Sequence, residues 1–233
     1  MQTIPLLKLD WCSYKAAKFA CVNWHYSKRM PDPKCVKIGV WEDDKFKGAV
    51  IFSRGISGSN IAKSLSIEPT EIAELSRVAL KDCINTTSKI VSIAIILLKK
   101  KACSLKLLVS YADFNVGHMG IIYQAGNWLY MGKSAKVPIF QDKNGNLIHD
   151  RSCSSTGYKK QFGSIKKVPN RNNLIRINQV EKWKYFMPLT KEMRKQILPL
   201  SKPYPKREPI STDSTFPVEK GGANPTLTLQ KSL

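Results

Sequence analysis

The sequence lacks any apolar run long enough to cross a membrane, which takes ~20 residues for a helix. Its longest apolar run spans residues 90–98 and is followed by Lys99, Lys100 and Lys101. The first residues do not combine a basic segment with an apolar one, so no secretory signal is predicted. We therefore expect a cytoplasmic protein with no membrane partner.

Metal-ligating residues are few and scattered. The chain has six cysteines without a CxxC pair, and only three histidines, whereas a structural zinc site takes a full tetrahedral set of closely spaced ligands. We therefore predict no metal site and read the cysteines as structural thiols in a reducing compartment. Two alternatives stay open. One is His118 as a metal ligand, and the other is weak binding of iron by carboxylate and tyrosine oxygens, for which no ligand motif exists.

Acidic residues are also scarce. The 17 Asp and Glu residues stand against 38 Lys and Arg residues, which gives a net charge of +21. Residues 1–130 hold 18 basic and 10 acidic residues (+8), and residues 131–233 hold 20 and 7 (+13). Such an excess favours a polyanionic partner, most simply nucleic acid. A role in solubility is the alternative, while an acidic membrane surface is disfavoured because no basic amphipathic helix stands out.

Apolar periodicity predicts an α/β fold in one domain over residues 1–200. Strands are expected at residues 3–9, 35–42, 45–54, 71–80, 107–109 and 183–189. Helices are expected at residues 11–24, 88–101 and 190–198, the first capped by Asp10 and the last by Thr190. This order corresponds to a three-strand meander that feeds a βαβ unit.

The densest group of reactive side chains lies in the stretch 106–132. Ser110 and Asp113 follow the apolar residues of a buried strand, and His118 and Tyr123 come next. Open α/β sheets place their sites at the carboxyl ends of such strands. We therefore predict a functional site here. The structural alternatives are that Asp113 caps a helix and that Tyr123 only packs its ring.

Two earlier segments carry polar groups with more than one interpretation. His25 and Tyr26 leave a helix end, where they suit either substrate contact or the helix dipole. Arg77 lies inside a predicted strand, where a guanidinium needs a carboxylate, phosphate or carbonyl partner. An internal salt bridge is the alternative for Arg77.

The character of the chain changes after residue 132. A hairpin is predicted over 137–149 because Asn144-Gly145 is a strong turn signal. Basic residues are then interleaved with aromatic ones over 151–176, a pattern that suits phosphate contact and base stacking. We expect residues 132–200 to be the nucleic-acid-contacting part of the domain and residues 201–233 to be a disordered tail rich in Pro, Ser and Thr.

Five longer blocks occur in order along the chain. They are WHYSKRMP (24–31), VWEDDKFKGAVIFSRG (40–55), ELSRVAL (74–80), SYADFNVGHMGIIYQAGNWLYMG (110–132) and PYPKR (203–207). Together they resemble the phage Mom family of DNA-modification proteins. The resemblance implies transfer of a glycine-derived, methylcarbamoyl-type group to adenine N6 of double-stranded DNA, in the host bacterial cytoplasm, which protects phage DNA from restriction. It also implies a GNAT-like acyltransferase fold with a mixed, mostly antiparallel central sheet flanked by helices and a basic C-terminal extension.

The resemblance also suggests roles for individual residues. The expected catalytic residues are Tyr26, Arg77, Ser110, Asp113 and Tyr123. The expected substrate contacts are His25, Ser27, Lys28, His118, Asn127 and Trp128. The expected nucleic-acid contacts are Arg29, Lys159, Lys160, Lys166, Lys167 and Arg171.

The group donor is the open question. Acetyl-CoA enzymes of the GNAT class carry a glycine-rich pyrophosphate loop between their fourth strand and the next helix, but residues 81–88 contain no glycine. Without glycine the backbone less readily presents consecutive amides to a pyrophosphate. We therefore favour glycyl-tRNA over acetyl-CoA as donor. A non-catalytic nucleic-acid-binding protein and a GNAT-type enzyme with another acceptor are the competing hypotheses.

Overall fold

The computed structural model describes residues 4–31, 35–54, 58–113, 117–161 and 163–206. It forms two compact units. The sheet unit comprises Met1–Tyr111, Gly120–Met131 and Tyr185–Leu233, and the basic unit comprises Ala112–Met119 and Gly132–Lys184. The single domain expected over residues 1–200 thus corresponds to two units, and most of the part expected to be basic lies in the second. No described helix is long and apolar enough to cross a membrane.

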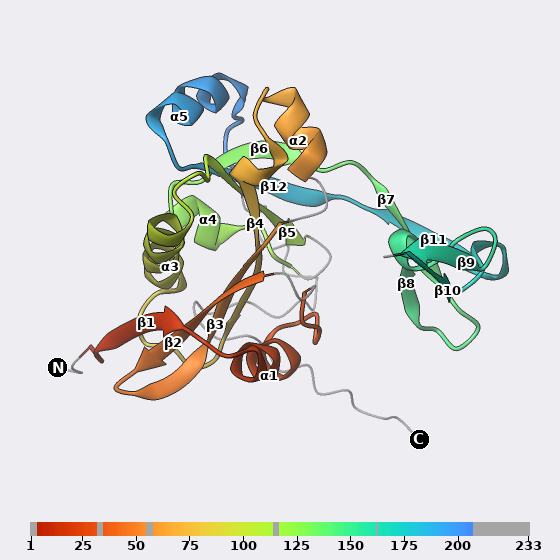
Figure 1. Ribbon diagram of the computed structural model, residues 1–233, viewed down its shortest axis with the longest axis horizontal. Helices are drawn as coiled ribbons and strands as arrows, with labels where there is room; N and C mark the ends of the chain where they lie inside the picture. Colours follow the sequence, from red (N-terminus) through yellow and green to blue (C-terminus); the bar gives the residue numbers. More distant parts are fainter. Residues whose placement is uncertain (1–3, 32–34, 55–57, 114–116, 162, 207–233) are drawn as a thin grey trace. The chain divides into compact units, whose positions relative to one another are not determined.

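The central feature of the sheet unit is a seven-stranded sheet with strand order β1-β2-β3-β4-β5-β12-β6 (Figure 1). Its strands are β1 (Leu7–Trp11), β2 (Cys35–Glu42), β3 (Lys45–Ser53), β4 (Ile72–Leu80), β5 (Leu107–Asp113), β12 (Lys182–Pro188) and β6 (Leu129–Lys133). The ladders from β1 to β4 are antiparallel, whereas β4 and β5 run parallel. The predicted mixed, mostly antiparallel sheet is confirmed.

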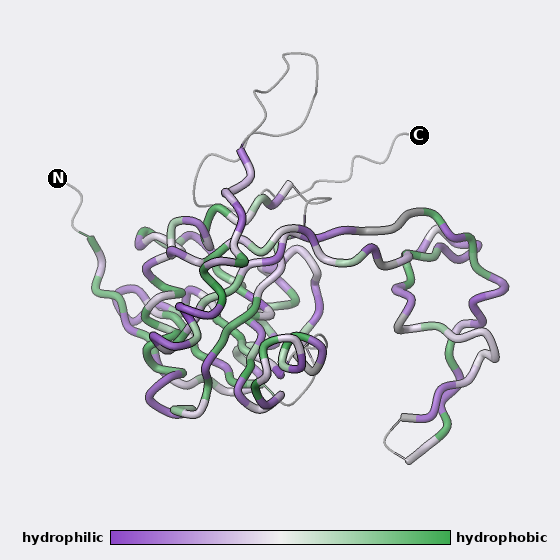
Figure 2. Tube along the Cα trace, turned by 90° about the horizontal axis from the view of Figure 1, so that it is seen from above, coloured by the Kyte–Doolittle hydropathy of each residue, from purple (hydrophilic) through white to green (hydrophobic). Residues whose placement is uncertain are grey.

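The β2–β3 hairpin shows how local sequence sets this order. Asp43 and Asp44 both have positive φ, 47° and 59°, as a two-residue turn between twisted strands requires. Hydrophobic and hydrophilic residues alternate along many of the described segments (Figure 2). Such alternation lets a strand bury one face.

Helices cover both faces of the sheet (Figure 1). They are α1 (Tyr14–Trp24), α2 (Gly58–Ser64), α3 (Thr87–Lys101), α4 (Ile121–Ala125) and α5 (Lys191–Ile197), with single 3-10 turns at Pro69–Glu71, Asp150–Ser152, Arg171–Asn173 and Leu198–Leu200. The first core cluster joins α1 to β3 and β4 through Ala17, Ala20, Cys21, Ala49, Ile51 and Ala79. The second joins α2 and α5 to the sheet through residues that include Leu65, Leu107, Phe186, Met193 and Ile197.

The cap of the last helix was predicted correctly, but that of the first was not. Thr190 accepts a hydrogen bond from the Met193 amide, as expected. At α1, however, Ser13 is the N-cap and accepts from the Ala16 amide at 3.2 Å. Asp10 instead lies in β1, because the strand runs to Trp11 in register with β2.

The basic unit contains two small sheets. One has the order β11-β7-β8, built from β11 (Ile175–Val180), β7 (Val137–Gln141) and β8 (Leu147–His149). The β7–β8 pair confirms the predicted hairpin, and Gly145 in its turn has a φ of 81°. The other sheet is the two-stranded ribbon of β9 (Tyr158–Gln161) and β10 (Ser164–Lys167).

The tail predicted from residue 201 begins too early. The Lys202 amide donates to the Tyr130 carbonyl at 2.8 Å, and the Tyr204 hydroxyl donates to the Trp128 carbonyl at 2.8 Å. Residues 201–206 are therefore held against β6 by backbone pairing that the Pro-rich composition conceals. Residues 207–233 lie outside the described residues.

Candidate active site

The candidate site lies where β4 and β5 separate. The parallel ladder between these strands ends at the pair of Glu74 and Val109. Beyond it, the Leu75 carbonyl accepts a hydrogen bond of 2.9 Å from the side chain of Ser110. Ser110 is only 1% exposed. A buried hydroxyl thus occupies the point where the two strands part.

Tyr123 contacts Ser110 from α4. The two hydroxyl oxygens lie 2.7 Å apart, and Tyr123 is 8% exposed. Since a serine hydroxyl has one proton, the Tyr123 hydroxyl is the donor in this pair whenever Ser110 donates to Leu75. Burial raises the pKa of Tyr123 far above its usual value, although the bond with Ser110 acts in the opposite direction. Tyr123 is therefore a neutral hydrogen-bond donor at any physiological pH.

Three further groups act on Tyr123 through their charge. Ionisation of Tyr26, Glu74 or Tyr185 adds to the rise of its pKa. Tyr26 is 43% exposed and lies in the loop after α1. Glu74 is a site candidate that the sequence did not single out, because strand periodicity alone does not show where two parallel strands diverge.

Arg77 fixes the loop that carries Tyr26. Its Nε donates to the Arg29 carbonyl at 3.3 Å, and its Nη1 donates to the Ser76 carbonyl at 2.6 Å. The predicted carbonyl partner of this strand arginine is therefore present. In the same loop, His25 Nδ1 lies 2.8 Å from Ser27 Oγ, and the His25 and Tyr26 rings are 4.3 Å apart.

The remaining predicted contacts of the sheet unit take different positions. Lys28 donates to the Asn23 carbonyl at 2.9 Å and thereby closes the end of α1. Asn127 adopts a φ of 57° in the turn after α4. Trp128, expected to bind substrate, is only 1% exposed because its ring packs against Tyr123 at a centroid distance of 5.1 Å. It supports the site from within the core.

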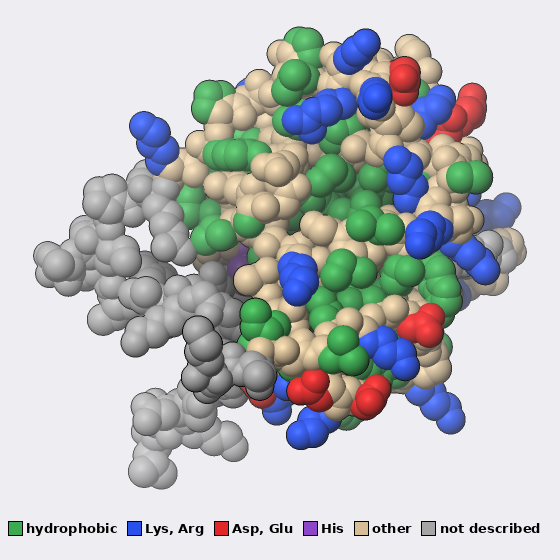
Figure 3. Space-filling model, turned by 90° about the vertical axis from the view of Figure 1, so that its left-hand side faces the viewer, with side chains coloured by type: hydrophobic (Ala, Val, Ile, Leu, Met, Phe, Trp, Pro, Cys, Tyr) green, Lys and Arg blue, Asp and Glu red, His purple; other side chains and the backbone are tan. Residues whose placement is uncertain are grey.

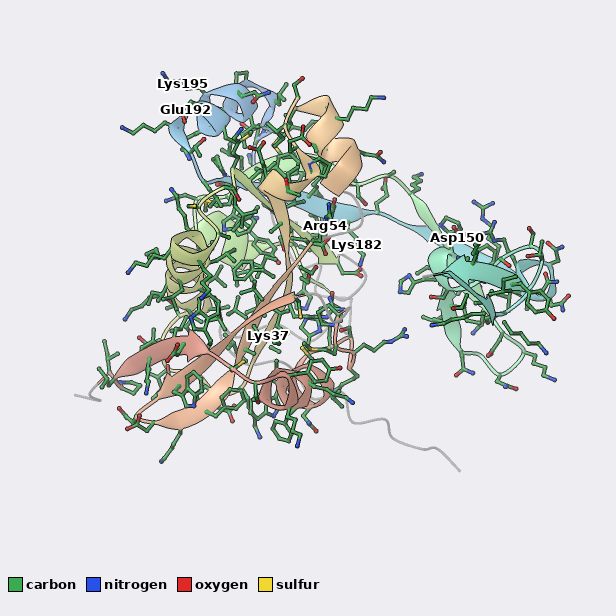
Figure 4. All side chains as sticks on the ribbon, in the orientation of Figure 1. Lys37, Arg54, Asp150, Lys182, Glu192 and Lys195 are labelled. Carbon is green, nitrogen blue, oxygen red and sulfur yellow. The ribbon has the colours of Figure 1, made fainter. Side chains whose placement is uncertain are left out.

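Asp113 and His118 belong to the basic unit. Asp113 forms an ion pair of 3.1 Å with Lys182, which is labelled in Figure 4, and its carbonyl accepts from the His118 amide at 3.1 Å. The expected meeting of Asp113 and Tyr123 stays a prediction. Among the described residues, no group of three or more His, Cys, Asp or Glu side chains could hold a metal ion.

The buried carboxylate of Glu42 binds the residues that precede α3 (Thr87–Lys101). Glu42, which is 2% exposed, accepts hydrogen bonds from the amides of Ile84 at 2.9 Å and Asn85 at 2.7 Å. It also accepts one from the Asn85 side chain at 2.9 Å. Burial acts to raise the pKa of Glu42, but these hydrogen bonds outweigh it and the pKa is lowered. A carboxylate of the chain itself therefore occupies the Ile84 and Asn85 amides just before the helix.

The predicted nucleic-acid contacts also differ in their surroundings. Lys159, Lys160, Lys166 and Lys167 all lie on the β9–β10 ribbon. Arg171 forms an ion pair of 2.7 Å with Asp150 and lies over the Phe140 ring, so its guanidinium already interacts with groups inside the basic unit. On the face drawn in Figure 3, Lys and Arg side chains are spread among hydrophobic ones and form no single patch.

The model of the Mom protein family matches residues 6–206. The chain belongs to the Mom family. It is similar to the methylcarbamoylase Mom of Escherichia phage Mu, with 24% identity over 208 residues that cover 86% of this chain and 84% of the relative. The family match spans all the catalytic residues predicted above.

Two solved structures also align with this Mom-family chain. One is an Acinetobacter baylyi protein described as an acetyltransferase, with 11% identity and a TM-score of 0.44 over 81% of this chain and 95% of the other. The second is an N-acyl amino acid synthase from uncultured soil microbes, with 11% identity and a TM-score of 0.44 over 82% and 94%.

Proposed function

We propose that this protein is a DNA-modifying transferase that places a methylcarbamoyl-type group on adenine N6 of double-stranded DNA. The observation that carries the proposal is membership of the Mom family together with the buried Ser110–Tyr123 pair. The net charge of +21 supports a polyanionic acceptor. To reach adenine N6 the enzyme either approaches from the major groove, where N6 is exposed, or flips the base out of the helix.

The chemistry requires help at two points. The N6 lone pair is delocalised into the ring, so the amine is a poor nucleophile. As N6 forms its bond to the donor carbon, one N6 proton must pass to a base and the bond to the leaving group must break. Positioned proton transfer of this kind typically contributes ~10²–10⁴-fold in rate.

We assign these tasks to residues at the parting of β4 and β5. Glu74 is a candidate base because it ends the β4–β5 ladder and its charge acts on Tyr123. Tyr123 keeps its proton and is suited to donate it to an oxyanion or to the leaving group once Ser110 turns its own proton from the Leu75 carbonyl to the Tyr123 oxygen. Asp113, the base expected from the sequence, forms an ion pair with Lys182 within the basic unit, and its role in proton transfer stays a prediction.

We further propose a charged tRNA carrying glycine as the donor. In this transfer N6 forms a bond to the ester carbonyl carbon, the ester C–O bond breaks, and the tRNA hydroxyl leaves with the N6 proton. The group that this step places on N6 is glycyl, which has the same atoms as methylcarbamoyl in a different order. The support is the carboxylate of Glu42, which occupies the Ile84 and Asn85 amides at the start of α3. An anion already bound there opposes a second one. A tRNA donor also agrees with the basic surplus of the chain.

The test is nucleoside mass spectrometry. Purified protein and duplex DNA are incubated with either glycyl-tRNA or acetyl-CoA. The DNA is then digested, and the mass and fragmentation of the released deoxyadenosines are measured. We expect a modified adenine with glycyl-tRNA only, and modification only with acetyl-CoA would overturn the donor proposal. An unaltered adenine profile in DNA from cells that contain the folded protein would favour the rival reading, a non-catalytic nucleic-acid-binding protein suggested by the charge.

A further inference from the structure

The β9–β10 ribbon is a basic element that lies in a stretch without acidic residues. Residues 151–180 contain no Asp or Glu. Within them, four lysines lie on eight paired ribbon residues. Arg171, just beyond the ribbon, is engaged with Asp150 and is not counted here.

The ribbon has no core of its own. All four residues of β10 are exposed, including Ile165 at 73%, and Tyr158 on β9 is 55% exposed. An isolated two-stranded hairpin without a packed face is marginally stable in water. The exposure of Ile165 and Tyr158 on this element is therefore better explained by contact with a binding partner than by a role in folding.

The register sorts the side chains onto two faces. Directly opposite residues share a face, and faces alternate along each strand. Lys159 lies opposite Lys166 on one face. The other face carries Tyr158 opposite Lys167 and Lys160 opposite Ile165. The Lys159–Lys166 pair places two positive charges on one face, where both can contact an anion.

The base of the ribbon is fixed to the rest of the basic unit. The Val168 amide donates to the Gly157 carbonyl at 2.8 Å, and the Ser154 hydroxyl donates to the Tyr158 carbonyl at 2.8 Å. The two strands thus project from an anchored base as one element.

We propose that the β9–β10 ribbon enters the major groove of double-stranded DNA. That groove is about 12 Å wide and admits a two-stranded β-ribbon. Lysines on both faces reach the phosphates on either side, while Tyr158 and Ile165 meet base edges and thymine methyl groups. Duplex RNA is a poor fit because its major groove is deep and narrow. The inference rests on the proposed function, since it takes DNA as the acceptor.

The test compares two variants of equal charge in the full chain. The ribbon variant replaces all four ribbon lysines by Gln: Lys159, Lys160, Lys166 and Lys167. The control variant replaces four exposed lysines of α1 and α5 by Gln: Lys15, Lys18, Lys191 and Lys195. Duplex affinity is measured against salt concentration without donor. We expect the slope of log Kd against log salt to fall by about 2 to 4 in the ribbon variant, at ~0.9 per lost phosphate contact. The control should lose clearly less.

A second duplex examines the groove. Its cytosines carry a bulky C5 glucosyl group, which fills the major groove and leaves the minor groove unchanged. We expect the wild-type chain to lose affinity for it. Unchanged affinity, an equal effect of both variants, or a ribbon variant that loses duplex RNA binding while keeping DNA binding would each overturn the proposal.

The two proposals fail in different ways. If the wild-type chain leaves adenine unmodified while the ribbon variant loses duplex binding, the proposed function fails and the ribbon assignment stands. If the wild-type chain modifies DNA and the ribbon variant binds with the wild-type salt slope, the ribbon assignment fails.

Discussion

The carboxylate of Glu42 accepts a hydrogen bond of 2.7 Å from the amide of Asn85, a residue 43 positions away. The same carboxylate accepts from the Ile84 amide and is buried. This contact joins the end of β2 to the residues that precede α3. It gives that junction an internal anion, so its shape does not depend on a bound phosphate.

Replacing Glu42 by Gln should lower the free energy of unfolding by about 2 kcal/mol at neutral pH, because buried amides lose a charged acceptor. Since the folded pKa of Glu42 lies below its ordinary 4.5, its contribution is present above that value and is lost as pH falls through the folded pKa. The gap between wild type and variant should therefore shrink below pH 4.5 in urea unfolding curves. Glu192→Gln on α5 (Figure 4) should show no such gap. A constant gap down to pH 3 would contradict this.

Tyr123→Phe should reduce adenine modification by about 10²-fold or more, because the neutral donor at the strand opening is lost. Duplex binding should persist. Tyr185→Phe is the matched control, since it removes a buried tyrosine hydroxyl that is bonded to Gln124, at 3.2 Å, and not to Ser110. Asp113→Asn should also abolish modification without loss of DNA binding. Full activity in both Tyr123→Phe and Asp113→Asn, assayed by nucleoside mass spectrometry, would refute the site assignment.

Gly120→Ala, in the sheet unit, should lower the stability of the protein by more than Gly117→Ala, in the basic unit. Both glycines have positive φ, 79° and 77°, which costs an L-residue ~1–2 kcal/mol. At Gly120 a Cβ would also meet the Tyr185 ring at 2.4 Å, whereas at Gly117 it meets nothing within 4 Å. Thermal unfolding measures the fall in Tm of each variant. The fall in Gly117→Ala gives the cost of the positive φ alone, and the additional fall in Gly120→Ala gives the cost of the contact with Tyr185. Equal shifts in Tm would show that the Tyr185 ring moves aside.

Alkylation should distinguish the cysteines. All six are free thiols. Burial raises the pKa of Cys12, Cys21 and Cys83 to about 11, so little thiolate forms there at pH 8. Cys103 is exposed, and iodoacetamide should label it first. Peptide mass spectrometry after short exposure, with the denatured chain as reference, tests this order. Rapid labelling of Cys21 in the folded protein would contradict it.

Local patterns predicted most of the fold. The β2–β3 hairpin, the Thr190 cap and the β7–β8 turn each depend on residues close in sequence, and all three were correct. The predicted N-cap of α1, Asp10, was wrong because Asp10 and Ser13 are both residues that commonly cap helices. The choice between them was made by the pairing of β1 with β2 far along the chain.

The candidate site was harder to predict because tertiary contacts define it. Tyr123 and Ser110 stood out as reactive types near a strand end, and the structure brings their hydroxyls together. Glu42 and Glu74 did not stand out, since a carboxylate in a strand has no local signal for what it will meet. Trp128 was expected to contact substrate, but it is buried against Tyr123 of α4, and sequence alone does not predict that packing.

The strand β6 ends the order of the seven-stranded sheet. The Lys202 amide bonds to the carbonyl of Tyr130 in this strand, and the Tyr204 hydroxyl bonds to the carbonyl of Trp128 just before it. An uncovered sheet edge is a template on which further chains can add. Protein shortened at residue 200 would therefore expose Tyr130 and its neighbours to pairing between molecules, and we expect it to precipitate as concentration rises. The short segment 201–206 thus protects the solubility of the whole molecule.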